Sequence, residues 1–402
     1  MKQVSGGVCA AKGFVAAGVH CGVKASSSPD KNDLALILSE KECTAAATYT
    51  LNRVTAAPLY VTMDHLENGV AWGVVANSGN ANACCPMSHE YAEEMARLAA
   101  RATGRAPADF VVASTGVIGQ RLPVDKVLQG IREIIPAKLA KENGSEAAYA
   151  IMTTDTVRKE CAYELQLSTG TVKIGAMAKG SGMIHPNMAT MLVYVTTDAK
   201  ADPADLQKML SAAVDKSFNM CTVDGDTSTN DTLYGLANGA SGVPASGGEA
   251  IKALSAALTS VLGDLAYMLV KDGEGASKVA RIHVAGAASD ADAERVARTV
   301  GHSQLVKTAL YGRDANWGRI VAAVGRSGAD FNPDDVVVTL CGVELFRKGQ
   351  PTDLDFDALL EEPLKQRDLP IDIVLGSGSG SYTLLASDLG HEYVNVNADY
   401  RS

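Results

Sequence analysis

Short apolar runs alternate with longer segments of helical periodicity along the whole chain. The short runs are bounded by turn-forming residues, which is typical of strands buried in a sheet. Residues 172–177 and 191–196 flank a Gly-rich turn and predict two strands on either side of it. Further strands are predicted over 109–113, 279–284, 336–340, 371–375, 382–386 and 393–396.

Helices are predicted where apolar and small residues recur on one side of a helical repeat. The clearest helix begins at Asp202-Pro203, where the proline occupies the first turn, and runs to about Lys216. The others cover 91–102, 125–135, 249–269, 290–300 and 356–364. This interspersed pattern predicts a mixed α/β (α+β) protein, without an internal repeat or a Pro-rich linker.

Composition and charge narrow the class of protein. The 402 residues suffice for two ordinary domains or one large one, and 47% of them are hydrophobic, so a sizeable core can be buried. A formal charge of −10 with few aromatic residues argues against nucleic-acid binding. The most apolar stretch, 256–270, is too short to span a membrane and contains Asp264. Because the N-terminus lacks a secretory apolar region, we expect a cytoplasmic protein.

Two features that could indicate a cofactor point elsewhere. The glycines of segment 376–381 resemble the dinucleotide-binding fingerprint G-x-G-x-x-G. That fingerprint, however, needs a third glycine where Ser381 stands and a helix after it, whereas the residues that follow have the pattern of a strand. A turn between two strands fits these glycines better. No Walker A sequence is present, and the eight cysteines show neither Cys-x-x-Cys pairs nor zinc spacing. We therefore predict no cofactor and no metal.

The segment 178–192 carries the most unusual local chemistry. Gly180 and Gly182 permit backbone geometries closed to other residues, and Pro186 restricts the residue before it. Such a loop can hold a peptide bond under strain. The candidate scissile bond is Ala189–Thr190, which places a small residue before a hydroxyl.

Cleavage of that bond would create a nucleophile and a base together. Attack of the Thr190 hydroxyl on the Ala189 carbonyl gives an ester, and water then releases Thr190 as a new N-terminus. Its α-amino group, with a reference pKa of about 7.7–8.0, can serve as a base for the adjacent hydroxyl. Local composition taken alone favours an ordinary strand threonine after a turn, and an ordinary turn role for His185.

The same segment resembles the processing site of the ornithine acetyltransferase (glutamate N-acetyltransferase) family, and the resemblance extends over nearly the whole chain. Several motifs occur in the family's order. They are Gly6-Gly-Val-Cys-Ala-Ala-Lys-Gly-Phe14, Asn77-Ser-Gly-Asn-Ala-Asn-Ala83, Ser114-Thr-Gly-Val-Ile-Gly119, Met152-Thr-Thr-Asp-Thr156, Lys179-Gly-Ser-Gly-Met-Ile-His-Pro-Asn-Met-Ala-Thr-Met-Leu192, Thr222-Val-Asp-Gly-Asp-Thr-Ser-Thr-Asn-Asp231, Asn316-Trp-Gly-Arg-Ile320 and Asn395-Val-Asn-Ala-Asp-Tyr-Arg-Ser402.

This resemblance implies an enzyme of arginine biosynthesis. The family transfers acetyl from N2-acetylornithine to glutamate by a ping-pong mechanism, through an ester that would form here on Thr190. Some members also use acetyl-CoA, and no residue of this sequence decides whether this chain does. The implied products of self-cleavage are an α chain, 1–189, and a β chain, 190–402, assembled as two of each. The implied fold is a layered sandwich similar to self-processing N-terminal-nucleophile enzymes, with a second C-terminal α/β lobe.

The resemblance also assigns roles to individual residues. Thr115 and Gly116 match the pair that forms the oxyanion hole. Thr153, Lys179, Glu274, Asn397 and Ser402 match substrate-contacting positions, as Thr190 does. Lys179 can pair with an α-carboxylate and Glu274 with the side-chain ammonium of ornithine. Thr154 competes with Thr153 for its role, and the C-terminal tail is expected to fold back over the site.

Other interpretations stay open from the sequence. A self-processing aminopeptidase or amidase would share the threonine chemistry but pass the acyl group to water. An uncleaved paralogue would bind acetylated amino acids without catalysis. Asn230, Asp231 and Trp317 are expected to support the scaffold. Cys84-Cys85-Pro86 departs from the Cys-Thr-Gly expected at this point, which leaves the shape of that loop in doubt.

Overall fold

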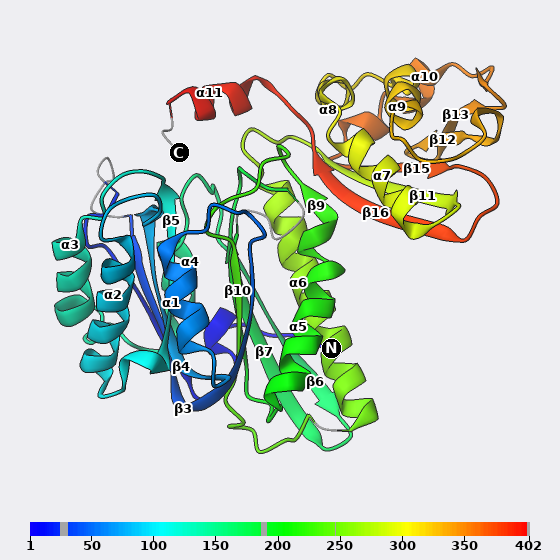
Figure 1. The fold of residues 1–402 in the computed structure, drawn as a ribbon. Helices are drawn as coiled ribbons and strands as arrows, with labels where there is room; N and C mark the ends of the chain where they lie inside the picture. Colours follow the sequence, from blue (N-terminus) through cyan, green and yellow to red (C-terminus); the bar gives the residue numbers. More distant parts are fainter. Residues whose placement is uncertain (25–30, 186–190, 246, 400–402) are drawn as a thin grey trace.

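The computed structural model describes residues 1–24, 31–185, 191–245 and 247–399. It shows a large N-terminal lobe, a smaller C-terminal lobe, and a final helix that returns from the second lobe across the first (Figure 1). The predicted mixed α/β class and the second C-terminal lobe are therefore confirmed.

A single mixed sheet organises the first lobe. Nine strands form it within the described residues, in the order β1-β6-β7-β8-β10-β3-β4-β5, with β2 paired to β3. Their bounds are β1 Lys2–Gln3, β2 Phe14–Val19, β3 Leu34–Tyr49, β4 Val70–Asn80, β5 Phe110–Val117, β6 Lys159–Leu167, β7 Gly170–Lys179, β8 Leu192–Thr197 and β10 Thr232–Ala237.

Strand β8 lies at the centre of this sheet and is buried on both faces. Leu192 and Tyr194 point into one core cluster, while Val193 and Val195 point into the other. This is the two-residue alternation of a strand with apolar layers on either side. Its first residue pairs with Lys179 of β7 and with Thr232 of β10, so the start of β8 is held from both neighbours.

Helices cover both faces of the first sheet. Those of this lobe are α1 Ala57–His65, α2 Ser88–Thr103, α3 Val124–Gln129, α4 Gly144–Ala150, α5 Pro203–Asp215 and α6 Gly248–Lys271. Helix α6 is long and apolar enough to cross a membrane by length and composition. Its buried leucines and valines, however, join the core cluster formed with α5 and the sheet, which accounts for its apolar composition.

The second lobe packs helices against a seven-stranded sheet of order β14-β13-β12-β15-β11-β16-β9, as far as the described residues show. Its strands are β9 Cys221–Thr222, β11 Val279–Ala287, β12 Val337–Leu340, β13 Val343–Arg347, β14 Gln350–Pro351, β15 Asp368–Val374 and β16 Gly380–Ser387. Its helices are α7 Asp290–Gly301, α8 Gln304–Tyr311, α9 Trp317–Gly325 and α10 Phe356–Leu360. Strand β9 comes from the first lobe, so its pairing with β16 joins the two lobes.

One predicted strand is wrong. Residues 393–396 lie in helix α11, His391–Asp399, although Tyr-Val-Asn-Val alternates like a strand. Tyr393 and Val396 are the half-buried positions of this segment, and they are spaced by three residues rather than two. No strand of the described residues pairs with this segment, so no sheet contact among them favours the extended form. The expected Gly-rich turn at 376–381 is confirmed, because it connects β15 to β16.

Candidate active site

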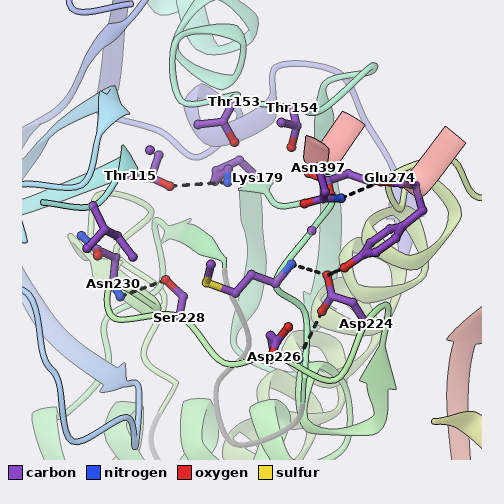
Figure 2. A pocket seen from close by; sticks show the side chains of 15 residues that line it. Thr115, Thr153, Thr154, Lys179, Asp224, Asp226, Ser228, Asn230, Glu274 and Asn397 are labelled. Carbon is purple, nitrogen blue, oxygen red and sulfur yellow. Dashed lines mark hydrogen bonds between the residues drawn. The ribbon is translucent and has the colours of Figure 1, made fainter. Parts of the chain in front are cut away.

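One polar pocket collects most of the residues singled out from the sequence. It has a volume of about 160 Å³ and lies where the ends of β5 and β7, the 224–230 loop, the end of α6 and helix α11 converge (Figure 2). The residues that line it are Thr115, Gly116, Ile118, Thr153, Thr154, Lys179, Gly182, Met183, Asp224, Asp226, Ser228, Asn230, Glu274, Tyr393 and Asn397.

Lys179 is the buried cation of the pocket. It ends β7, is only 3% exposed, and donates from Nζ to the Thr115 hydroxyl at 3.5 Å. Burial lowers the pKa of its ammonium, while the carboxylates of Asp155, Asp231 and Glu274 oppose that shift. A cation in such a site can bind an anionic ligand group strongly, because little water competes for it.

Thr115 and Gly116 stand where the pairing of β4 with β5 becomes irregular. Asn80 pairs with both Thr115 and Val117, a bulge of the kind that redirects groups at sheet ends. Gly116 has φ 129, and a Cβ placed there would lie 2.3 Å from the Gly79 carbonyl carbon. Only glycine fits this backbone, which holds the Thr115–Gly116 pair rigidly at the pocket wall.

A buried ionic network fixes two walls of the pocket together. Asp155 accepts bonds from the N–H groups of Thr153 at 2.9 Å and Gly180 at 2.7 Å. Lys159, which is fully buried, lies 2.6 Å from carboxylate oxygens of both Asp155 and Asp272. Although burial opposes it, the charges of Lys159 and Lys179 hold the pKa of Asp155 below its usual range. The Thr153 backbone and the end of β7 are therefore positioned by one carboxylate.

Glu274 and helix α11 form the opposite wall. Asn397 donates from Nδ2 to Glu274 Oε2 at 2.7 Å, as Figure 2 shows. A Cβ on Gly182 would lie 2.4 Å from Glu274 Oε2, so glycine there leaves room for this carboxylate. The tail thus folds back over the site as far as residue 399, in place of a frayed end.

Several pocket residues were not predicted as site residues, among them Asp224, Asp226 and Tyr393. Asp224 accepts from the N–H groups of Met183 at 2.6 Å and Ile184 at 2.9 Å, and burial raises its pKa. Tyr393 donates its hydroxyl to Asp224 at 3.3 Å, and Asp226 lines the same wall. The Asp-Gly-Asp turn after a short strand was the only local signal for the two aspartates, whereas the place of Tyr393 depended on the return of α11.

The other residues predicted for the site are either outside the described part of the chain or line the pocket without a tested role. Ala189, Thr190 and Ser402 lie outside the described residues, as does the proposed chain boundary at 189/190. Thr153 and Thr154 both line the pocket, and the Thr154 hydroxyl hydrogen-bonds to that of Ser181 at 2.7 Å. The substrate role assigned to either threonine stays a prediction.

The residues expected to support the scaffold make structural contacts. Asn230 donates to the carbonyls of Ala81 at 2.7 Å and Ser114 at 2.9 Å, which ties the ends of β4 and β5 together. Trp317 stacks on Phe346 in the second lobe, with ring centroids 5.7 Å apart. Among the described residues, no group of three or more His, Cys, Asp or Glu side chains could hold a metal ion.

Fold and pocket together define a two-lobed α/β protein whose site combines a buried cation with a carboxylate, a pairing that suits a small zwitterionic ligand. Residues 15–402 match the ArgJ family, and the chain belongs to that family.

Several known proteins are similar to this chain. It is 57% identical to the arginine biosynthesis bifunctional protein ArgJ of Nitratidesulfovibrio vulgaris, over 97% of this chain and 99% of that protein. It is 48% identical to the protein of the same name from Symbiobacterium thermophilum, over the full length of both. A crystal structure of ornithine acetyltransferase complexed with ornithine, from Mycobacterium tuberculosis, is 38% identical with a TM-score of 0.41, over 46% of this chain and 97% of that one.

Proposed function

We propose that this ArgJ-family enzyme transfers acetyl from N2-acetylornithine to glutamate in arginine biosynthesis, after cutting itself between Ala189 and Thr190. The observation that carries the proposal is the pocket itself, which brings Lys179, Thr115, Gly116 and Glu274 together, with Lys179 paired to the first residue of β8. Thr190 precedes that strand by two residues and would supply the nucleophile.

The first half-reaction forms an acetyl ester and releases ornithine. The Thr190 hydroxyl attacks the acetyl carbonyl, and its proton moves to the free α-amino group of the same residue. The Thr115 hydroxyl and the Gly116 N–H donate to the oxyanion that develops on the carbonyl oxygen. The C–N bond then breaks, and the proton leaves with the ornithine amine. In the second half-reaction the glutamate amine attacks the ester and restores the threonine.

The charges of the pocket suit both amino-acid substrates. Each carries an α-carboxylate, which the buried Lys179 ammonium can bind. Ornithine adds a side-chain ammonium, for which Glu274 offers a carboxylate already held by Asn397. One pocket that takes two substrates in turn is what a ping-pong reaction requires.

Three further properties belong to the same proposal. The active form would consist of α chains (1–189) and β chains (190–402), two of each. The protein would act in the cytoplasm. Acetyl-CoA would be an additional donor if the enzyme also forms N-acetylglutamate directly, and incubation of the purified protein with acetyl-CoA and glutamate tests this.

Intact mass measured before and after incubation with acetylornithine tests the core of the proposal. Denatured protein should give two masses, for pieces ending at Ala189 and beginning at Thr190, and the second should gain one acetyl group. Glutamate should then remove that group as N-acetylglutamate. Initial rates at several glutamate concentrations should give parallel double-reciprocal lines.

The control is Thr190→Ala, which should stay uncut and inactive because the hydroxyl is absent. A single full-length mass in fully active enzyme would exclude self-cleavage. Intersecting lines without a trapped acetyl group would favour direct transfer in a ternary complex. If water removes the acetyl group as fast as glutamate does, the protein is a hydrolase instead.

A further inference from the structure

Asn230 belongs to the same pocket as Thr115 and Gly116, the two residues assigned to the oxyanion hole and called the oxyanion pair below. It lies in the loop before β10, is 4% exposed, and lines the pocket with them (Figure 2). Its bonds to two backbone carbonyls fit the scaffold role expected for it. The place of those carbonyls in the chain gives this residue a more specific task.

The hydrogen-bonding capacity of the Asn230 side chain is already in use. A carboxamide nitrogen carries two hydrogens, and Nδ2 donates to the Ala81 carbonyl at 2.7 Å and to the Ser114 carbonyl at 2.9 Å. Its oxygen Oδ1 accepts from the Thr229 hydroxyl at 2.6 Å. While these bonds persist, Asn230 has no side-chain hydrogen to donate to a substrate or to an oxyanion, although it lines the pocket.

The two carbonyls bracket the oxyanion pair. Ser114 immediately precedes the pair, and because a peptide unit is planar, holding its carbonyl also holds the nitrogen of the next residue. Val117 immediately follows the pair, and its carbonyl accepts the Ala81 N–H at 3.0 Å. Since Asn230 holds the carbonyl of Ala81, both ends of the pair are fixed, one by Asn230 directly and the other through Ala81.

A side chain serves here because the ladder between β4 and β5 is irregular at this point. The register shifts at Asn80, which pairs with both Thr115 and Val117. Such a bulge leaves backbone groups without their regular partners. Asn230, which comes from another part of the chain, supplies donors to two carbonyls at this irregularity.

We propose that Asn230 is a positioning residue of the acetyl-transfer reaction, which fixes the backbone of the oxyanion pair so that its two donors stay directed at the developing charge. This inference rests on the proposed function, because it takes Thr115 and Gly116 to form the oxyanion hole. Asn230 itself does not touch the reacting atoms. It acts beforehand, by removing the freedom of the two donors to turn away from the pocket.

The expected effect follows from how an oxyanion hole works. Donors that are fixed in advance stabilise charge better than mobile ones, because they need not reorient while the charge develops. A displacement of about 1 Å in such a site can lower a rate on the order of 10²-fold. The oxyanion forms in both half-reactions, once from acetylornithine and once from the acetyl ester. Loss of Asn230 should therefore slow both half-reactions alike, which lowers kcat and leaves the KM of each substrate unchanged.

Asn238, at the other end of β10, is a matched structural residue. It directly follows the strand, is 6% exposed, and donates from Nδ2 to the Lys12 carbonyl at 2.9 Å and to the Ser39 hydroxyl at 3.1 Å. Both asparagines are therefore buried, and each ties two other segments together through two hydrogen bonds. Neither partner of Asn238 belongs to the oxyanion pair or adjoins it in the sequence.

Asn230→Ala and Asn238→Ala test the inference side by side. Both full-length proteins are scored for cutting by intact mass and assayed for melting temperature, kcat and the KM of each substrate, with rates expressed per cut chain. Both should melt below wild type, because each leaves buried acceptors without a donor. We expect kcat to fall on the order of 10²-fold in Asn230→Ala, with both KM values unchanged, whereas Asn238→Ala should keep the wild-type kcat.

A double-mutant cycle with Thr115→Ala separates positioning from a general loss of structure. If Asn230 acts through the oxyanion pair, its loss matters less once one donor of the pair is already absent. The Asn230→Ala/Thr115→Ala enzyme should therefore lose less kcat than the product of the two single losses, by about threefold or more. The losses of Asn238→Ala and Thr115→Ala should simply multiply, because the two sites are independent. Should Asn230→Ala fail to fold, Asn230→Ser, whose hydroxyl can donate to one carbonyl, takes its place, with an expected fall in kcat of about tenfold.

Several results would overturn the assignment. They are a wild-type kcat in Asn230→Ala, equal falls in kcat for the two asparagine variants, a raised KM with normal kcat, and losses that multiply in the Asn230→Ala/Thr115→Ala enzyme. An Asn230→Ala protein that folds but stays uncut, beside a normally cut Asn238→Ala, supports the assignment, because the chemistry is lost while the fold is kept. Failure of the proposed function is visible separately, since the wild type would then transfer no acetyl group from acetylornithine to glutamate.

Discussion

Single residues in this protein are constrained by very local chemistry. Gly116 is required because a Cβ there would collide with the Gly79 backbone, whereas a Cβ on Gly182 would take the space that the Glu274 carboxylate occupies. The sequence motifs indicated that these glycines matter, but not what they approach. Thr115 is 5% exposed, and its hydroxyl accepts a hydrogen bond from Lys179, so the hydroxyl is placed for a specific polar task rather than for solvation.

Replacing Thr115 by alanine tests its assignment to the oxyanion hole. The backbone of Gly116 should stay in place, so only one donor is lost. We expect kcat to fall roughly 10²–10³-fold with KM nearly unchanged, since the hydroxyl donates to charge that exists only in the transition state. Thr115→Ser should keep most of the rate. A raised KM with normal kcat would instead assign Thr115 to substrate binding.

Secondary-structure elements bring these residues together. The ends of β7 and α6 were close to their predicted positions, because their apolar patterns are strong and bounded by turn residues. Strand β5 instead continues to Val117, beyond its predicted end at 113, and so includes Thr115 and Gly116. Helix α11 was predicted as a strand, since Tyr-Val-Asn-Val alternates. An alternating pattern of apolar and polar residues stabilises a strand only where a neighbouring strand can pair with it. In this segment the half-buried residues, Tyr393 and Val396, are three positions apart, which is the spacing of a helix.

Helix α11 offers a prediction with an internal control. Asn397→Ala removes the bond to Glu274, so that carboxylate loses its fixed orientation. We expect KM for acetylornithine to rise more than KM for glutamate, because only ornithine presents an ammonium to Glu274. Val394→Ala, on the same helix at a position that is 64% exposed, should leave both constants unchanged. If both variants changed the two KM values equally, the effect would come from the helix in general and not from the bond between Asn397 and Glu274.

At the scale of the whole molecule, the proposed cut divides a sheet rather than two domains. Strand β7 belongs to the first piece and β8 to the second, yet they pair over six positions, from Ile174 with Thr197 to Lys179 with Leu192. Strand β10 of the second piece likewise pairs with β3 of the first. The two pieces therefore share one core.

This shared core predicts that the cut pieces stay together. Residues 1–189 and 190–402 should co-elute under native conditions and appear as one mass in native mass spectrometry. They should separate only in denaturant, because parting them would expose both apolar faces of β8. Dissociation of the pieces on simple dilution would contradict the common sheet.

The sequence by itself determined the α/β class, seven of the sixteen strands and six of the eleven α-helices found in the described residues, and part of the pocket lining. A helix or strand with one buried face repeats its apolar residues at a regular spacing, which can be read from the sequence. A reaction likewise needs particular residue types, which limits the candidates for a site. Tertiary structure alone decided which of these residues meet. The return of α11 brought Tyr393 and Asn397 to Asp224 and Glu274, from positions more than a hundred residues away. Whether such residues meet depends on neighbours that the sequence order does not specify.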